Sequence, residues 1–328
     1  MFLPFLGQEF SGAALICIGF SVGVLAGFFG MGGGWVVTPA LYSLGFPMPF
    51  AIGTELANIT GQSALATVKH RKMRNVDWML GLWVGLSMMV GVEGGKHALM
   101  WTGRFGDADA LVRWLYAVLL GVLGCYVLYD YFWPKLGSHA TPNGPPKQKP
   151  LARLRVPPML QLRVCGLEVS LWVLVGLGLA IGCMAGVMGC GGGFALVPAF
   201  VYLLGIPTVV AVGTSLVCVL LSGAYGTFTF GADGRVEVIA VMWLVLGSFV
   251  GTQFGTSAVR YVRGRGIRVL YGIMLILATV GVLLTQFEMR LAGGWAALGG
   301  AMVMCVIIIG RMCAVIASRR SETADGVS

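Results

Sequence analysis

Long runs of apolar residues recur along almost the whole chain. Nine of them predict membrane-spanning helices, near residues 10–30, 50–68, 77–101, 112–133, 166–188, 208–230, 236–258, 268–286 and 292–316. A helix needs roughly 20 such residues to cross the hydrocarbon core of a bilayer. Because 57% of the 328 residues are hydrophobic and only 11% are charged, a water-soluble fold would lack the polar side chains to cover its surface. We therefore predict an all-α polytopic membrane protein in a lipid bilayer.

Basic residues gather in a few of the segments between these runs. They cluster at 69–74, in the Pro-rich connector 134–165, at 260–268 and near the C-terminus at Arg319 and Arg320. Since basic loops stay on the cytoplasmic side of a membrane, the connector and the C-terminus are predicted to be cytoplasmic. This topology also accounts for the net charge of +9, so we expect no nucleic-acid partner. Two short apolar segments, 34–45 and 193–205, must then cross fully or re-enter from one side.

The chain contains an internal repeat. Residues 27–39 read GFFGMGGGWVVTP and residues 186–198 read GVMGCGGGFALVP; each is followed by a Gly-x-Pro and then by a Gly-Thr pair. The offset stays at 159 to 160 residues through about 65 positions, which indicates a duplication. The charged loops predict that the two halves cross the membrane in opposite directions, an arrangement typical of secondary transporters. We divide the chain into a first transmembrane repeat (1–133), a cytoplasmic linker (134–165), a second, inverted repeat (166–290) and an extra C-terminal span with its tail (291–328).

The glycine runs of the two repeats are candidate binding loops. Glycine costs about 1 kcal/mol relative to alanine inside a helix, so these runs should break their helices and expose backbone N–H groups. Helix N-termini attract anions, and two of them would converge on one small anionic substrate. The candidate residues are Gly30, Gly32, Gly33, Gly34, Gly189, Gly191, Gly192 and Gly193. Close helix packing is the alternative reading of the same glycines. A nucleotide-phosphate loop is disfavoured because no Gly-Lys-Ser/Thr follows.

Polar side chains form one stripe on the helix after each short segment. A polar stripe should face the protein interior, either as part of a substrate path or to hydrogen-bond neighbouring helices. The first half contributes Thr54, Glu55, Asn58 and Gln62, and the second contributes Thr214, Ser215, Cys218 and Ser222.

Two acids, Glu55 and Glu93, lie well inside predicted spans. Loss of water favours the neutral form of a carboxyl group and suits it to bind and release a proton, so both are candidates for proton coupling. Glu55 is the better placed of the two, and Glu93 could instead pair with Lys96 or His97. The eight cysteines are scattered, with no metal-ligand spacing, so we expect no metal, no cofactor and no disulfide framework. Cys190, within the second glycine run, is interpreted as an apolar filler.

At these residues the chain resembles the TauE/SafE family of membrane permeases, also called sulfite exporter-like proteins. The resemblance rests on the paired segments 27–39 and 186–198, the following Gly-Thr pairs and the basic central linker. It implies transport of sulfite, of organosulfonates such as sulfoacetate or of related small anions, mostly in bacterial inner membranes, with a preference for export. It also implies that the loop glycines and the neighbourhoods of Thr54 and Thr214 bind the substrate.

Three other readings remain open at this stage. An anion channel or an uptake permease would use the same fold, whereas an intramembrane enzyme would need Glu55, Glu93 and His97 to converge. We do not expect an enzyme, because no metal-binding motif such as HExxH occurs. The oligomeric state is also open, and a homo-oligomer is compatible with the sequence.

Overall fold

The computed structural model describes residues 2–3, 8–9, 11–104, 108–133, 156–162, 164, 166–262, 264–286 and 290–325. The first half holds α1 (Gly12–Phe29), α2 (Gly34–Ser43), α3 (Met48–Lys72), α4 (Trp78–Thr102) and α5 (Ala108–Phe132). The second half holds α6 (Leu171–Met188), α7 (Gly193–Pro198), a π-helix η2 (Ala199–Leu204), α8 (Thr208–Ala232), α9 (Val238–Ala258) and α10 (Gly264–Gln286). A final helix, α11 (Arg290–Asp325), follows. Two small antiparallel hairpins pair β1 (Phe2–Leu3) with β2 (Gln8–Glu9), and β3 (Met159–Leu162) with β4 (Leu167–Ser170).

The predicted class, an all-α polytopic membrane protein, is confirmed. Among the described residues, eight helices are long and apolar enough to cross a membrane. The 25-residue helix α3 is not one of the eight; it carries Glu55 and a basic last turn, and much of it is buried in the bundle.

The predicted start of one span was wrong, and most of the linker cannot be compared. The span expected from residue 166 begins at Leu171, because the preceding residues pair as β4 in the hairpin with β3. The last helix runs past residue 316 to Asp325. Residues 134–155, 163 and 165 of the predicted linker lie outside the described part of the chain.

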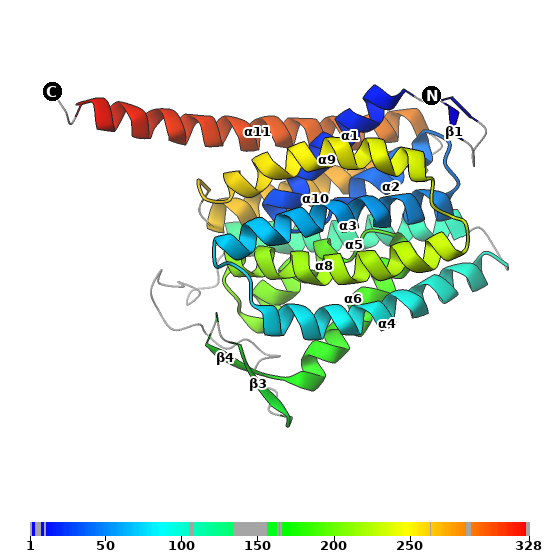
Figure 1. Ribbon diagram of the computed structural model, residues 1–328, viewed down its shortest axis with the longest axis horizontal. Coiled ribbons are helices and arrows are strands. Elements are labelled where there is room, and N and C mark those ends of the chain that lie inside the picture. Colours follow the sequence, from blue (N-terminus) through cyan, green and yellow to red (C-terminus); the bar gives the residue numbers. More distant parts are fainter. Residues whose placement is uncertain are drawn as a thin grey trace.

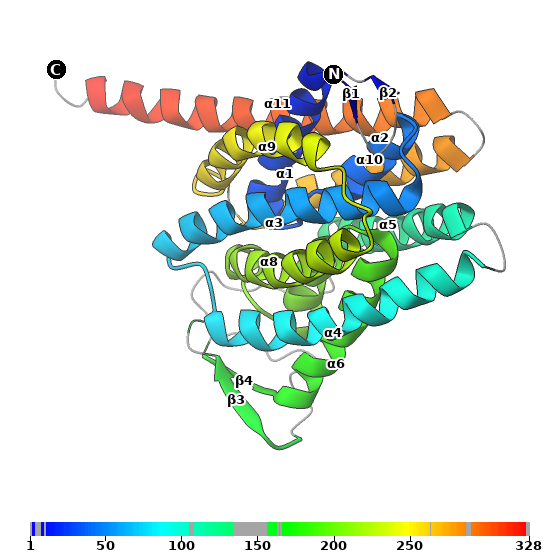
Figure 2. The same ribbon diagram turned by 45° about the vertical axis from the view of Figure 1, so that its right-hand side comes forward.

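The first helix of each half packs against a helix of the other half. Helix α1 packs along α9, and α6 packs along α4 (Figures 1 and 2). Small residues repeat every fourth position on the touching faces, so the backbones approach closely. A Cβ added at Gly251 would lie 2.0 Å from the Phe20 carbonyl oxygen, and one at Gly182 would lie 2.4 Å from that of Met88. These contacts leave no room even for alanine, which explains much of the glycine content.

Two other helix pairs run antiparallel through the bundle. In the middle, α3 lies beside α8, with Thr60 and Thr227 side by side and Gly53 near Phe230 (Figures 1 and 2). Helix α5 lies beside α10, where Gly121 faces Thr279 and Gly272 faces Leu128. In both pairs, residue numbers rise along one helix as they fall along the other. Helix α11 packs outside these pairs, against α10 and α2.

The π-helix η2 explains why the repeat offset changes. Pro39 corresponds to Pro198 at an offset of 159, whereas Tyr42 corresponds to Tyr202 at 160. One residue is therefore inserted between positions 198 and 202, where η2 lies. A π-turn accommodates a single extra residue within a helix, so the second short segment stays helical despite the insertion.

Candidate functional site

Both glycine runs interrupt their helices, as predicted. Helix α1 ends at Phe29 and α2 begins at Gly34; likewise α6 ends at Met188 and α7 begins at Gly193. Left-handed φ angles of 65° to 84° occur at Gly30, Gly32 and Gly33 and at the matching Gly189, Gly191 and Gly192. A Cβ strains this conformation, so three glycines in each loop are required by the backbone.

The two loops meet back to back in the interior of the bundle. A Cβ at Gly34 would lie 2.5 Å from Cys190 Cα, and a Cβ at Gly193 would lie 2.5 Å from Met31 Cα. Gly32 and Gly191 both face the side chains of Ile59 on α3 and Val219 on α8. The starts of α2 and α7 therefore converge. The loops are in contact, so a substrate passing between them requires that they separate.

Side chains of the predicted polar stripes hold the loop carbonyls. Ser215 Oγ donates to Gly30 O at 2.7 Å, and Ser222 Oγ donates to Gly191 O at 3.3 Å. Gln62 Nε2 donates to Gly32 O. In this conformation the three side chains therefore make structural hydrogen bonds, which was the alternative to a substrate path. The same bonds place the side chains directly against the loops.

Glu55 is completely buried on α3. Its Oε2 accepts a hydrogen bond from Asn58 Nδ2 at 3.0 Å, and Asn58 Oδ1 accepts one from Ser248 Oγ on α9 at 2.7 Å. Ile52, one turn earlier on α3, lies against Gly189, so Glu55 lies beside the second loop. Its Oε1 has no hydrogen-bond partner among the described residues. Oε1 of Glu55 is therefore available to accept a hydrogen bond or to bind a proton.

Further along α3, buried side chains continue the polar face that begins at Glu55. Ser63 Oγ, Thr67 Oγ1 and His70 Nδ1 have no partner among the described residues. His70 Nε2 lies 3.2 Å from Gly27 O on α1. These atoms extend the polar face from Glu55 toward the end of α3.

Thr54 and Thr214 fix the starts of other helices. The hydroxyl of Thr54 accepts from the N–H of Glu237 at 3.1 Å, and that of Thr214 accepts from the N–H of Asp77 at 3.0 Å. Asp77 and Glu237 are the N-cap residues of α4 and α9. The matched bonds tie α3 to α9 and α8 to α4, a role that the sequence did not predict for the two threonines.

Glu93 lies apart from the polar network around the loops. Its side chain is 34% exposed on α4 and lies 3.3 Å from His97 Nδ1, one of the two partners considered from the sequence. Lys96 instead reaches Asp233 Oδ2 at 2.9 Å and donates to Thr229 O at 2.8 Å. The hydrogen bond from Lys96 holds the pKa of the Asp233 carboxyl below its ordinary value. Asp233 follows α8, so this ion pair ties α4 to the end of α8.

Sequence reasoning missed a second recurring motif. Arg113 and Tyr116 on α5 and Arg268 and Tyr271 on α10 each stand in an Arg-x-Leu-Tyr sequence. Tyr116 donates its hydroxyl hydrogen to Met188 O at 2.6 Å, and Tyr271 donates to Phe194 O. Both bonds reach the residues that flank the second glycine loop. An internal comparison would have found the motif at an offset of 155, outside the range of 159 to 160 that marks the loops.

Cys190 is fully buried between the loops, consistent with its interpretation as a filler. Within the described part of the chain, no group of three or more His, Cys, Asp or Glu residues is placed to hold a metal ion.

Comparison with known proteins identifies the family. The profile of the family described as Sulfite exporter TauE/SafE matches residues 15–282, from α1 to near the end of α10. The chain belongs to the TauE/SafE family. That family consists of membrane transporters, so this TauE/SafE protein is a membrane transporter with a small-molecule substrate and not an enzyme.

Two of the curated relatives of this TauE/SafE protein are similar over most of their length, and a third is similar over a shorter segment. The probable membrane transporter protein YunE of Bacillus subtilis is 24% identical over 271 residues, which cover 80% of this chain and 94% of the relative. A probable membrane transporter protein of Xylella fastidiosa is 25% identical over 274 residues, covering 81% and 91%. One from Methanocaldococcus jannaschii is 35% identical over 82 residues, 23% of this chain and 31% of the relative. No solved structure matches the chain significantly.

Proposed function

We propose that the protein is a secondary transporter of small anions that exports sulfite or an organosulfonate such as sulfoacetate across the bacterial inner membrane. Two inverted halves would rock about the glycine loops and expose the site to each side in turn. The observation that carries the proposal is the meeting of two helix-breaking loops in the interior, each held by side chains of a central helix.

The loops favour an anion as the substrate. In α2 the first helical bonds come from the N–H groups of Val36 and Val37, and in α7 from those of Ala195 and Leu196. The N–H groups before them therefore point out of the helix starts, where they attract negative charge. When the loops separate, both sets would face one cavity. The predicted substrate residues are the loop glycines with Asn58, Gln62, Ser215, Ser222 and, less directly, Thr54 and Thr214.

Antiparallel packing supports the inverted orientation of the halves. Helices α3 and α8 are matched elements of the repeat, and they run in opposite directions where they touch. If the basic segments lie on the cytoplasmic side, as the positive-inside rule predicts, the linker and the C-terminus would also be cytoplasmic. Alternating access follows naturally from such a pair of halves.

Glu55 is the proposed proton-coupling residue. It is buried, it keeps one oxygen without a partner among the described residues, and it heads the polar face that leads to His70. Coupling to a proton or to the membrane potential would supply the driving force. Glu93 remains a second candidate for proton binding, although its pairing with His97 gives it a local partner.

The sulfur-oxyanion class is supported by the family description alone. The family is described as a sulfite exporter, and the curated relatives are named as transporters without a substrate. The substrate is therefore the first property to measure.

The test is flux of labelled sulfite and of labelled sulfoacetate in proteoliposomes, with and without an imposed pH gradient. Wild type is compared with Glu55→Gln and with Glu168→Gln, which alters an exposed carboxyl on β4. We expect gradient-dependent flux in wild type and Glu168→Gln that is lost in Glu55→Gln. If neither anion moves in folded protein, the sulfur-oxyanion assignment is wrong.

The same experiment separates the alternatives. A carrier saturates and shows counterflow of unlabelled for labelled substrate, whereas an anion channel conducts without counterflow. The contact between the loops favours the carrier, because it closes the central path in this conformation. An uptake permease would show the opposite preferred direction under the same gradient.

A further inference from the structure

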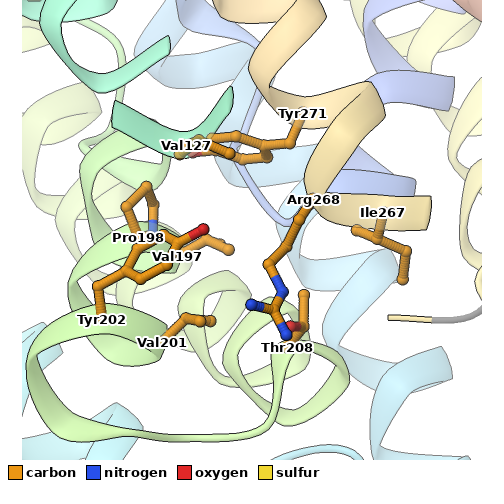
Figure 3. Close-up of a pocket in the computed structure, with 9 residues that line it drawn as sticks. All are labelled: Val127, Val197, Pro198, Val201, Tyr202, Thr208, Ile267, Arg268 and Tyr271. Carbon is orange, nitrogen blue, oxygen red and sulfur yellow. The ribbon is translucent and has the colours of Figure 1, made fainter. Parts of the chain in front are cut away.

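Two narrow crevices lie beside the short helices, and each contains one arginine. The first is formed by α2, α3, α5 and α10, and is lined by Thr38, Pro39, Tyr42, Met48, Arg113, Tyr116 and Val282. The second is lined by Val127, Val197, Pro198, Val201, Tyr202, Thr208, Ile267, Arg268 and Tyr271. Figure 3 shows Arg268 extending from α10 into the second crevice, toward Thr208.

The two crevices are equivalent positions of the duplicated fold. Pro39 and Tyr42 correspond to Pro198 and Tyr202, and Met48 corresponds to Thr208. Arg113, Tyr116 and Val282 match Arg268, Tyr271 and Val127, with the roles of α5 and α10 exchanged. An arginine, a deeper tyrosine and a tyrosine of the short helix thus occur twice.

The crevices lie at opposite ends of the α5–α10 pair. Arg268 is in the same crevice as Val127, and Arg113 in the same one as Val282, because the helices are antiparallel. Residue 121 of α5 faces residue 279 of α10, and residue 128 faces residue 272. Arg268 is therefore level with about residue 132 of α5. From there to Arg113 is about 28 Å at the helical rise of about 1.5 Å per residue. This separation is close to the thickness of a hydrocarbon core, about 30 Å.

Each arginine is followed by a connection to the loops. Arg113 Nη1 donates to Tyr42 OH at 2.7 Å, and its guanidinium lies 5.3 Å from the Tyr42 ring centroid. One turn further along α5, Tyr116 binds Met188 O beside the second loop. At the other end, Tyr271 follows Arg268 and binds Phe194 O. Each arginine is therefore followed, one turn later, by a tyrosine that is hydrogen-bonded to backbone beside the second glycine loop.

We propose that the Arg113 and Arg268 crevices are a matched pair of anion-binding vestibules, one on each face of the membrane. Each would hold a small oxyanion on the guanidinium before it passes to, or after it leaves, the loops. Each arginine is partly buried, and the planar fork of a guanidinium suits an oxyanion. The inference rests on the proposed anion transport and extends it to two further sites.

A carboxylate lies close to the guanidinium of Arg268. Arg268 Nη1 lies 3.8 Å from Asp130 Oδ2 on α5, whereas the position that matches Asp130 at the offset of 155 is Thr285. The carboxylate competes with an incoming anion for Arg268. We expect removal of this carboxylate to strengthen binding of the anion at Arg268.

The test is sided kinetics with labelled sulfite as the probe. Right-side-out and inside-out vesicles holding the full chain give the KM for each face, in wild type, Arg113→Gln and Arg268→Gln. We expect Arg113→Gln to raise the KM about tenfold or more from the outer face only, and Arg268→Gln to do so from the cytoplasmic face only. Arg311→Gln, at an exposed residue of α11, should change neither KM.

Lysine variants keep the test decisive if a glutamine variant fails to fold. Arg113→Lys and Arg268→Lys retain the charge and should show a smaller rise on the same single face. If wild type transports and the arginine variants leave both KM values unchanged, or raise both equally, the vestibules are refuted. If wild type carries no anion at all, the proposed function fails instead.

Discussion

Helices α3 and α8 contact the glycine loops in the same way but differ in the chemistry of their side chains. Each lies against both glycine loops and donates from its stripe to a loop carbonyl, through Gln62 on α3 and Ser222 on α8. Only α3 carries a carboxyl group, because Glu55 corresponds to Ser215. The two halves therefore share the shape of the site, but only the first half has an ionisable side chain on its central helix.

The hydrogen bonds show what the difference means. The Ser215 hydroxyl has two acceptors close by, Gly30 O at 2.7 Å and Val212 O at 2.9 Å. Glu55 has one bonded oxygen and one without a partner among the described residues. Ser215 is thus fixed in this conformation, whereas Glu55 has capacity to bind a proton or a new donor. We infer that α8 supports the loops through hydrogen bonds and that α3 couples them to the driving force through Glu55.

The largest effect is expected for substitutions in the glycine loops, where the two halves are alike. Gly34→Ala and Gly193→Ala each place a Cβ about 2.5 Å from backbone of the opposite loop. Overpacking of this kind costs typically about 1–3 kcal/mol, so both variants should lose transport and unfold at lower temperature. Gly176→Ala on α6, whose Cβ would meet nothing within 4 Å, is the control. Thermal unfolding and flux measure both; near-normal behaviour of either loop variant would contradict the contact between the loops.

The loops could be predicted from sequence because glycine has few roles that recur in such runs. GMGGG and GCGGG indicate broken helices, and the stripe of Glu55, Asn58 and Gln62 indicates an inward face. The pairing of α1 with α9 could not be predicted in the same way. Its glycines require some close partner, but nothing in one chain's spacing says which helix that partner is.

The arginine motif was missed for a physical reason as well. Helix α4 has 25 residues and α9 has 21, so the second half is about one turn shorter before its last helix. The offset between matching residues therefore changes to 155, and a comparison at a fixed offset of 160 does not pair Arg113 with Arg268. Tyr116 and Tyr271 gain their roles only from the carbonyls that they reach in space.

The next largest effect should separate the two acids. Glu55→Gln should abolish the pH-gradient dependence of flux and leave gradient-independent exchange of substrate, because the buried site no longer releases a proton. Glu93→Gln should lower gradient-driven flux less than about threefold, since that side chain is partly exposed and pairs with His97. Matched flux assays at several pH gradients decide this. Equal losses in both variants would assign coupling to both acids.

A smaller effect compares the loop donors of the two halves. Gln62→Ala and Ser222→Ala each remove one hydrogen bond to a buried loop carbonyl, at a cost of about 1 kcal/mol or more. Gln62→Ala should be the more destabilising because it also removes a larger buried side chain. Thermal unfolding in detergent gives the order, with Val68→Ala, an exposed side chain on α3, as the control. The reverse order would mean that the second loop depends on its donor more than the first.

The smallest effect concerns the two arginine crevices. Asp130→Asn removes the carboxylate 3.8 Å from Arg268, and should lower the KM from the cytoplasmic face by about threefold, since partly exposed ion pairs contribute about 1 kcal/mol or less. The KM from the outer face should not change. A change on the outer face alone would reverse the assignment of the crevices to the two sides.

The inverted arrangement of the two halves underlies every sided prediction, and cysteine labelling tests it most directly. Lys72 at the end of α3 and Ala232 at the end of α8 are equivalent and exposed positions. Lys72→Cys and Ala232→Cys are each placed in a background without the native cysteines and treated with a membrane-impermeant maleimide. We predict that Lys72→Cys is labelled only in inside-out vesicles and Ala232→Cys only in right-side-out vesicles. Labelling of both from the same face would contradict the inversion, and with it the alternating-access account.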